Sequence, residues 1–253
     1  GFVAMGNKSS ISGRLGFIES VLSSTRLPSL KPSRVVPVQT GGKWRIVSVP
    51  CADMQYLSPL HKSMYNHLSS FDWLLRGDAK PSKFKGFGSV KGEVFVSGDY
   101  ESATDNLNQQ VQQEILGMIL DTTTTVPDGV KQLARESLSL DLESADRSIL
   151  VKQRRGQMMG NLLSFPLLCV VNYLTFRFFM GASTPVRVNG DDIVFRSDPK
   201  SARRWMDGVG RSGLVLSKGK TVVDSRYFTL NSALFKGCSK NVKSLPFIRS
   251  KAL

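Results

Sequence analysis

The chain has 253 residues, of which 41% are hydrophobic, a composition ordinary for a globular protein that buries a core. Its formal net charge of +14 indicates a polyanionic partner and favours nucleic acid over a membrane surface. Three widely separated cysteines and two histidines argue against a structural zinc site and indicate free thiols in a reducing compartment.

The charges are unevenly distributed along the chain. Residues 1–98 carry 13 basic and 5 acidic residues, net +8, and residues 199–253 carry 12 and 2, net +10. Residues 99–198 carry 9 basic and 13 acidic residues, net −4. A basic frame around an acidic centre suits a protein that holds a phosphate backbone and binds metal ions at its centre.

Residues 35–49 predict a β-hairpin that turns on Gly41-Gly42, after an N-terminal stretch whose Ser, Gly and Pro content predicts mostly loop. Lys43 and Arg45 alternate with apolar residues in its second strand, so both cations are expected on one strand face. Taken alone, this pattern favours a solvated face.

Apolar residues recur every three or four positions over residues 54–75 and predict a helix. Lysines between residues 80 and 91 then alternate with Phe84 and Phe87. Basic residues spaced by aromatic rings are typical of a surface that follows a nucleic-acid backbone and stacks on bases. A solvated loop explains this segment equally well.

Residues 93–97 predict a strand that delivers Asp99 at its end. A helix capped by Asn106 is expected to follow, reaching about residue 120. A carboxylate at the end of a buried strand suits metal and phosphate chemistry, and Asp105 can bend back toward the same site. Considered alone, Asp99 is better explained as a residue that caps the end of the strand.

Residues 149–161 predict a strand that runs into a loop bounded by Gly156 and Gly160. Glycines let the backbone approach a ligand closely, and the following helix N-terminus favours phosphate. That helix, over residues 162–180, is apolar but interrupted by a proline, an asparagine and an arginine, which predicts a buried core helix rather than a membrane span. The N-terminus lacks a signal-peptide pattern and an initiator Met, so we expect a fragment of a longer protein.

Residues 186–195 predict a β-hairpin that turns on Asn189-Gly190 and places Asp191 and Asp192 side by side. Adjacent carboxylates repel each other, and a bound cation would offset that cost. The alternative is an ordinary solvated turn. Downstream, a helix over residues 199–211, a lysine-rich turn, a second hairpin and a basic tail are expected.

In this order, the segments resemble the palm of viral RNA-dependent RNA polymerases, in particular of the narnavirus, ourmia-like and levivirus lineage, including botourmiaviruses. The similarity covers residues 34–236, and six motifs in family order argue against coincidence. They are motif F (residues 43–45), A (99–106), B (156–166), C (189–192), D (218–220) and E (225–232).

The resemblance implies an α+β fold: a right-hand polymerase palm, built on an antiparallel sheet with flanking helices. It further implies partial fingers with the basic hairpin over residues 1–92, the palm over residues 93–236, and a basic tail or the start of a thumb over residues 237–253. The thumb is expected to be largely absent.

The implied activity is that of an RNA-directed RNA polymerase that replicates a positive-strand RNA virus genome with two Mg²⁺ ions, Mn²⁺ being an alternative. Such ions prefer carboxylate ligands and clamp the attacking and leaving oxygens. Asp99 and Asp191 are the expected ligands, with Asp192 as support. Lys220 is the first choice for the general acid and Lys218 the second.

The resemblance also implies which residues bind substrate. Lys43 and Arg45 would neutralise the triphosphate. Asp105 and either Asn161 or Asn172 would read the ribose 2′-hydroxyl, which marks RNA. The loop residues expected at the template and nucleotide backbone are Gly156, Gly160 and Ser164.

The implied partners are an RNA template, nascent RNA and nucleoside triphosphates, without an obligate protein partner or a transmembrane segment. The host cytoplasm is the expected compartment, with the mitochondrion as alternative. A reverse transcriptase is a rival, although Asn189-Gly190-Asp191-Asp192 and the polar Asp105 argue against it. A non-catalytic RNA-binding fragment is the second rival.

Overall fold

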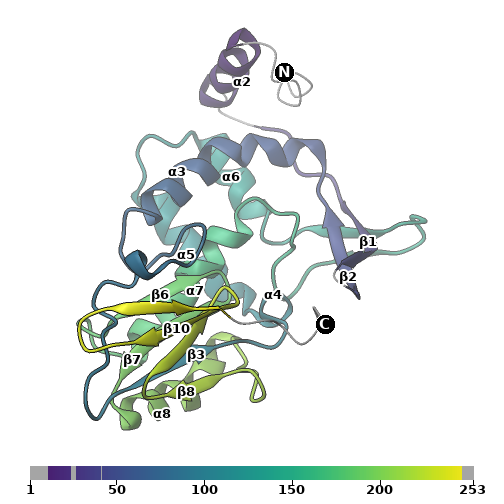
Figure 1. Ribbon diagram of the computed structural model, residues 1–253. Helices are drawn as coiled ribbons and strands as arrows, with labels where there is room; N and C mark the ends of the chain where they lie inside the picture. The colour runs from purple at the N-terminus through teal and green to yellow at the C-terminus, as the bar shows by residue number, and fades with distance from the viewer. Residues whose placement is uncertain (1–10, 24–26, 41, 247–253) are drawn as a thin grey trace. The chain divides into compact units, whose positions relative to one another are not determined.

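The computed structural model describes residues 11–23, 27–40 and 42–246 (Figure 1). The chain divides into two compact units, the first comprising residues 1–66 and 107–167 and the second residues 67–106 and 168–253. The functional division predicted at residues 92/93 and 236/237 stays a prediction.

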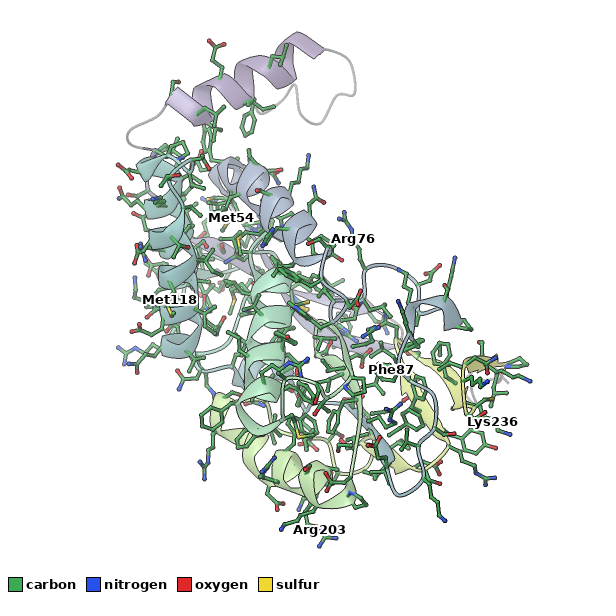
Figure 2. The ribbon with its side chains drawn as sticks, turned by 90° about the vertical axis from the view of Figure 1, so that its left-hand side faces the viewer. Met54, Arg76, Phe87, Met118, Arg203 and Lys236 are labelled. Atoms are coloured by element: carbon green, nitrogen blue, oxygen red, sulfur yellow. The ribbon has the colours of Figure 1, made fainter. Side chains whose placement is uncertain are left out.

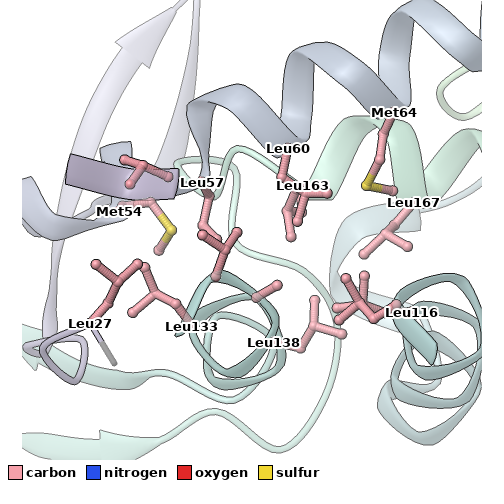
Figure 3. Packing of buried hydrophobic residues seen from close by; sticks show 14 of the residues in the cluster. Leu27, Met54, Leu57, Leu60, Met64, Leu116, Leu133, Leu138, Leu163 and Leu167 are labelled. Carbon is pink, nitrogen blue, oxygen red and sulfur yellow. The ribbon is translucent and has the colours of Figure 1, made fainter. Parts of the chain in front are cut away.

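A layer of helices with a leucine- and methionine-rich core forms most of the first unit (Figure 3). Fully burying one such side chain contributes about 1.5–3 kcal/mol, so this cluster rather than helix propensity stabilises the layer. The helices that contribute to it are α2 (Ile11–Ser23), η1 (Ala52–Leu57), α3 (Ser58–Leu68), α5 (Gln109–Thr122), α6 (Asp128–Glu136) and the start of α7 (Ser164–Phe179).

The N-terminus of α5 corrects one sequence-based expectation. Its cap is Asn108, whose side-chain oxygen accepts hydrogen bonds from the backbone N–H groups of Gln110 and Val111 at 2.9 and 3.3 Å. The predicted cap, Asn106, instead ends the short helix α4 (Ala103–Asn106), and its amide donates to the carbonyl of Glu101 at 2.9 Å. Both asparagines suit a cap chemically, and only the chain path chooses between them.

A four-stranded sheet completes the first unit, in the order β2-β1-β4-β5. The predicted hairpin is confirmed, because β1 (Ser33–Thr40) and β2 (Lys43–Val49) pair antiparallel. β4 (Asp141–Ser144) pairs parallel with β1 and antiparallel with β5 (Leu150–Lys152).

The second unit is built on an antiparallel sheet in the order β6-β7-β3-β8. β3 (Val94–Gly98) runs through its centre, between β7 (Asp192–Ser197) and β8 (Val222–Asp224). β6 (Val186–Asn189) pairs with β7 through the predicted Asn-Gly turn, where Gly190 has φ of +63°.

Side chains alternate between the two faces of this sheet along each strand. Both faces are covered by other parts of the unit. On one face, Phe195 contacts Phe176 of α7 and Trp205 of α8 (Pro199–Gly208), with ring centroids 5.0 and 4.8 Å apart. On the other face, Phe95 contacts Phe228 with centroids 4.8 Å apart. Phe228 belongs to a smaller antiparallel sheet formed by β9 (Tyr227–Leu230), β10 (Ala233–Gly237) and β11 (Val242–Leu245).

The interpretation of Phe84 and Phe87 as rings that stack on bases is wrong. They follow η2 (Pro81–Lys83) and are 3% and 0% exposed, packed among the aromatic rings on the second face of the sheet. Aromatic rings bury large apolar areas, so they enter a core wherever the chain allows it.

The apolar stretch over residues 162–180 forms a core helix, as predicted. In α7, Leu167, Val171 and Phe176 are at most 1% exposed. Within the described ranges, no helix is both long and apolar enough to cross a membrane.

Candidate active site

Two carboxylate-bearing strand ends meet at one edge of the sheet in the second unit. β3 and β7 pair antiparallel with Gly98 opposite Ile193, so the register carries Asp99 toward Asp192. Gly98 is required there, because a Cβ atom would lie 2.8 Å from the Ile193 side chain and 2.9 Å from Trp205. The packing beneath the strand end therefore helps to fix the position of Asp99.

A cavity of about 170 Å³ opens beside these carboxylates. Lys220 lines it, and its Nζ lies 3.7 Å from Oδ1 of Asp99. Asp191 and Lys218 do not line this cavity. Asp191 is exposed and is the sequence neighbour of Asp192, which does line it. Its lining residues are Ser97, Gly98, Asp99, Asp192, Lys220, Thr229, Leu230, Asn231 and Ser232.

The turn between β9 and β10 also belongs to this site, and the sequence did not predict its contact with Asp192. The backbone N–H of Asn231 donates to Oδ2 of Asp192 at 3.1 Å. Asn231 and Ser232 have φ of +50° and +59°, which match a two-residue hairpin turn between short β-forming runs. That turn signal is present in the sequence, but its contact with Asp192 spans 39 residues.

Burial, followed by the charge of Asp191, raises the pKa of Asp192 to about 6, and Asp99 contributes in the same direction. Asn231 and Lys220 act against that rise. Without a cation, the three carboxylates therefore repel one another in a partly desolvated site.

In the absence of metal, Asp192→Asn is expected to stabilise the fold by about 1–3 kcal/mol at pH 7.5, at about 1.36 kcal/mol per pKa unit. The folded pKa of Asp192, about 6, exceeds its ordinary value of 3.8, so stability is lost as the pH rises between those values. Asparagine keeps the acceptor for Asn231 but has no charge. Thermal unfolding in EDTA measures the effect.

The same comparison at pH 4 is the control for Asp192→Asn. Near that pH, Asp192 is protonated in the folded protein, so the gain should shrink strongly. An equal gain at both pH values would show that charge repulsion is not its cause.

Side chains from α7 contact the Asn189-Gly190 turn between β6 and β7. Asn172 Nδ2 donates to the carbonyl of Gly190 at 3.0 Å, and the Gly190 N–H donates to the Cys169 sulfur at 3.2 Å. Tyr100 donates its hydroxyl to Oδ1 of Asn172 at 2.8 Å. Burial, then Asp191, raises the pKa of Tyr100 well above 10, so the hydroxyl keeps its proton.

Asn172→Ala is expected to destabilise the protein by about 2–4 kcal/mol, because it leaves the Tyr100 hydroxyl and the Gly190 carbonyl buried without partners, at about 1–3 kcal/mol each. Asn172 is 0% exposed, so water does not replace it readily. Urea denaturation measures the loss. Tyr100→Phe is the matched variant: if the two losses add fully in the double mutant, the residues do not act as one network.

The predicted loop residues of motif B lie in the first unit, where neighbouring segments hold them. Gly160 approaches Ser48, where an added Cβ would lie 2.2 Å from the Ser48 carbonyl oxygen. Asn161 donates to the carbonyl of Ser137 at 2.7 Å and accepts from the Leu163 N–H at 2.9 Å. Both are therefore engaged in internal packing.

The other predicted residues occupy simpler surroundings. Gly156 has φ of +74°, and its carbonyl accepts from Gln153 Nε2 at 2.9 Å. Ser164 donates its hydroxyl to the carbonyl of Met158 at 2.8 Å. Of the remaining three, Asp105 on α4 and Arg45 on β2 are exposed, and the side chain of Lys43 lies outside the described part of the chain.

Comparison with known proteins decides the family. The model of the mitovirus RNA-dependent RNA polymerase family matches residues 35–247. The chain belongs to this family. The predicted viral polymerase lineage is confirmed by the RNA-dependent RNA polymerase of Ourmia melon virus (isolate Melon/Iran/VE9), which is 31% identical over 181 residues, 63% of this chain and 21% of that protein.

Solved structures confirm the predicted right-hand polymerase fold. The RNA-dependent RNA polymerase of a human picorbirnavirus matches with a TM-score of 0.64 and 16% identity, over 83% of this chain and 45% of that one. Apo telomerase from Candida Tropicalis matches with a TM-score of 0.64 and 13% identity, over 90% and 58%. The chain thus spans about a fifth of the viral relative and about half of each solved structure.

Membership of the mitovirus polymerase family implies the use of divalent metal ions. Among the described residues, no group of three or more His, Cys, Asp or Glu side chains is arranged to hold a metal ion as it stands. The chemistry of Asp99, Asp191 and Asp192 nevertheless fits one, because they are hard oxygen donors. Burial and then the charges of Asp191 and Asp99 raise the pKa of Asp192, and a divalent cation would offset both effects.

Proposed function

We propose that this chain carries the catalytic centre of an RNA-directed RNA polymerase, which replicates a positive-strand RNA virus genome by template-directed nucleotidyl transfer. The observation that supports this most is the meeting of Asp99 with the Asp191-Asp192 turn on paired antiparallel strands, beside a cavity lined by Lys220. Family membership supports the same activity.

Asp99 and Asp191 are the proposed ligands of two Mg²⁺ ions, with Mn²⁺ as an alternative and Asp192 as support. When bound, the ions stabilise charge on the attacking and leaving oxygens of phosphoryl transfer. The hydrogen bond from the Asn231 N–H, which orients one carboxylate oxygen of Asp192, supports the proposal of this secondary role.

Lys220 is the proposed general acid for the pyrophosphate leaving group. Its ammonium group lies at the cavity and is 3.7 Å from Asp99, whereas Lys218 is outside the cavity lining. A proton donor must lie within hydrogen-bonding reach of the oxygen it protonates, so Lys220 is the better placed of the two.

Substrate contacts extend this proposal. Arg45, exposed on β2, and Lys43 neutralise the triphosphate, and Asp105 reads the ribose 2′-hydroxyl. The carboxamides of Asn161 and Asn172 are both hydrogen-bonded internally, so either would read ribose only after exchanging a partner. The further proposed contacts to RNA are Gly156, Gly160 and Ser164.

The proposed partners are an RNA template, nascent RNA and nucleoside triphosphates, with replication in the host cytoplasm or mitochondrion. An extension assay on an RNA template tests the activity, with incorporation expected from ribonucleotides in Mg²⁺. Preference for deoxyribonucleotides would instead identify a reverse transcriptase. RNA binding that falls with salt, without any extension, would identify a non-catalytic binding fragment.

A further inference from the structure

The second unit contains a larger cavity, of about 300 Å³, that shares no residue with the carboxylate cavity. It lies among the segment that follows α3, the η2 loop and β6. Its volume is at the lower end of the range of about 300–1,000 Å³ that is usual for sites binding small ligands. The cavity is large enough for part of a nucleotide but not for a folded partner.

The lining of this cavity is strongly cationic. Arg76, Lys83, Lys85 and Arg187 contribute four positive charges and Asp72 one negative charge, which leaves a net +3. Three serines also line it. Guanidinium, ammonium and hydroxyl groups together are the donors that bind phosphate oxygens, so the lining matches a phosphate in both charge and hydrogen bonding.

Arg187 is the preorganised member of this set, because it is 7% exposed and held from several sides. Its Nε donates to the carbonyl of Lys83 at 2.8 Å, and its Nη2 donates to that of Lys85 at 3.2 Å. Its Nη1 donates to the carbonyl of Val186 at 2.8 Å, and the guanidinium lies over the ring of Phe87, 5.2 Å from its centroid.

Arg187 also has N–H groups that can donate hydrogen bonds to a ligand. Three of its five N–H groups are engaged as above, which leaves two without an acceptor among the described residues. In the described ranges it forms no salt bridge within 4 Å, and burial lowers its pKa, an effect that the charge of Asp72 in the same lining opposes. A buried cation that is compensated only at longer range is costly. An anion in the cavity would offset that cost.

The wall of the cavity is hydrogen-bonded to β6, the β-strand that ends at the Asn189-Gly190 turn. The Leu75 N–H donates to the carbonyl of Val188 at 2.9 Å, and Asn189 Nδ2 donates to the carbonyl of Leu75 at 2.7 Å. The next residues along the chain are Gly190 and Asp191. An RNA that passes the Asn189-Gly190 turn would therefore meet a cationic cavity beside β6.

We propose that this cavity is a second phosphate-binding site, distinct from the catalytic centre, which holds a phosphate group of RNA or of a free nucleotide. The site would anchor the nucleic acid at the edge strand β6. This proposal rests on the RNA-binding part of the proposed function, not on catalysis.

The test variant is Lys83→Gln combined with Lys85→Gln, because both side chains are exposed and their replacement leaves the buried Arg187 in place. Lys200→Gln with Arg203→Gln on α8 is the matched control, with the same reduction in charge. Those two side chains are exposed, and Arg203 lies far from Arg76 in Figure 2. Thermal unfolding is measured first to check that both variants are folded.

Binding of a fluorescent single-stranded RNA is measured in EDTA over a range of salt concentrations. The cavity variant is expected to bind about 10-fold more weakly than wild type, because charge-assisted hydrogen bonds to phosphate are removed. The slope of log affinity against log salt should also become shallower by about 0.7 for each phosphate that the variant no longer neutralises. The control variant is expected to retain the wild-type slope.

A second arm measures ATP and inorganic phosphate, also in EDTA, to identify the source of the phosphate. Weaker binding in the RNA arm alone assigns the site to a strand phosphate, and weaker binding of ATP or phosphate alone assigns it to a free nucleotide. If the cavity variant matches the control in both arms, the proposal is overturned. Because no step requires catalysis, these outcomes are independent of whether the chain extends RNA.

Discussion

Asp191→Ala is expected to lower template-directed incorporation of ribonucleotides by about 10³–10⁵-fold. Metal ions stabilise transition-state charge by several kcal/mol, and each 1.36 kcal/mol corresponds to a tenfold change in rate. Removing a proposed metal ligand should therefore abolish most of the activity. Single-turnover extension of an RNA primer–template in Mg²⁺ measures the effect, with RNA binding in EDTA expected to be unchanged or slightly stronger.

Asp192→Ala is the comparison that assigns the two roles at the turn. Asp191 is exposed and outside the carboxylate cavity, whereas Asp192 lines it together with Asp99. If Asp191 is the ligand and Asp192 its support, Asp191→Ala costs more. A larger loss for Asp192→Ala would reverse the roles, and activity within tenfold of wild type for both would refute the site.

Lys220→Gln is expected to lower the rate of the chemical step by about 10²–10⁴-fold, the usual contribution of a positioned general acid. Lys220 lines the cavity beside Asp99, so its proton is available where the leaving group is proposed to develop charge. Rapid-quench measurement of a single incorporation isolates this step. The solvent deuterium isotope effect on it should also decrease, because a proton transfer is removed.

Two variants make the test of Lys220 specific. Lys218→Gln removes the same charge two residues away, outside the cavity lining, and should retain most of the activity. Lys220→Arg keeps the charge but donates a proton poorly, so it separates electrostatic stabilisation from acid catalysis. Full activity in Lys220→Arg would show that the charge alone is required.

Local features of the structure follow from local sequence patterns. The Asn189-Gly190 turn forms as predicted, because glycine tolerates the observed φ of +63° and the flanking residues favour strands. Asp99 directly follows a strand as predicted, because β-forming residues precede it. In both cases the decisive interactions lie within a few residues of one another.

Choices between similar residues could not be made from the sequence. Asn106 and Asn108 are equally able to cap a helix, yet only Asn108 does so. The helix predicted over residues 54–75 ends at Leu68, and the residues that follow turn instead to line the basic cavity. Phe84 and Phe87 enter the core because a sheet from the C-terminal part of the chain meets them there.

By itself, the sequence determined the family, the residue types at the site, and the order along the chain of the strands that carry the carboxylates. These features depend on motif spacing, turn chemistry and apolar periodicity, which are local. Only the tertiary structure decided which groups meet: Tyr100 with Asn172 across 72 residues, Asn231 with Asp192 across 39, and Arg187 with the η2 loop across more than 100. Such contacts depend on the packing of the whole unit. That packing joins Asn172 to the Asn189-Gly190 turn and places Arg187 in the lining of the proposed phosphate-binding cavity.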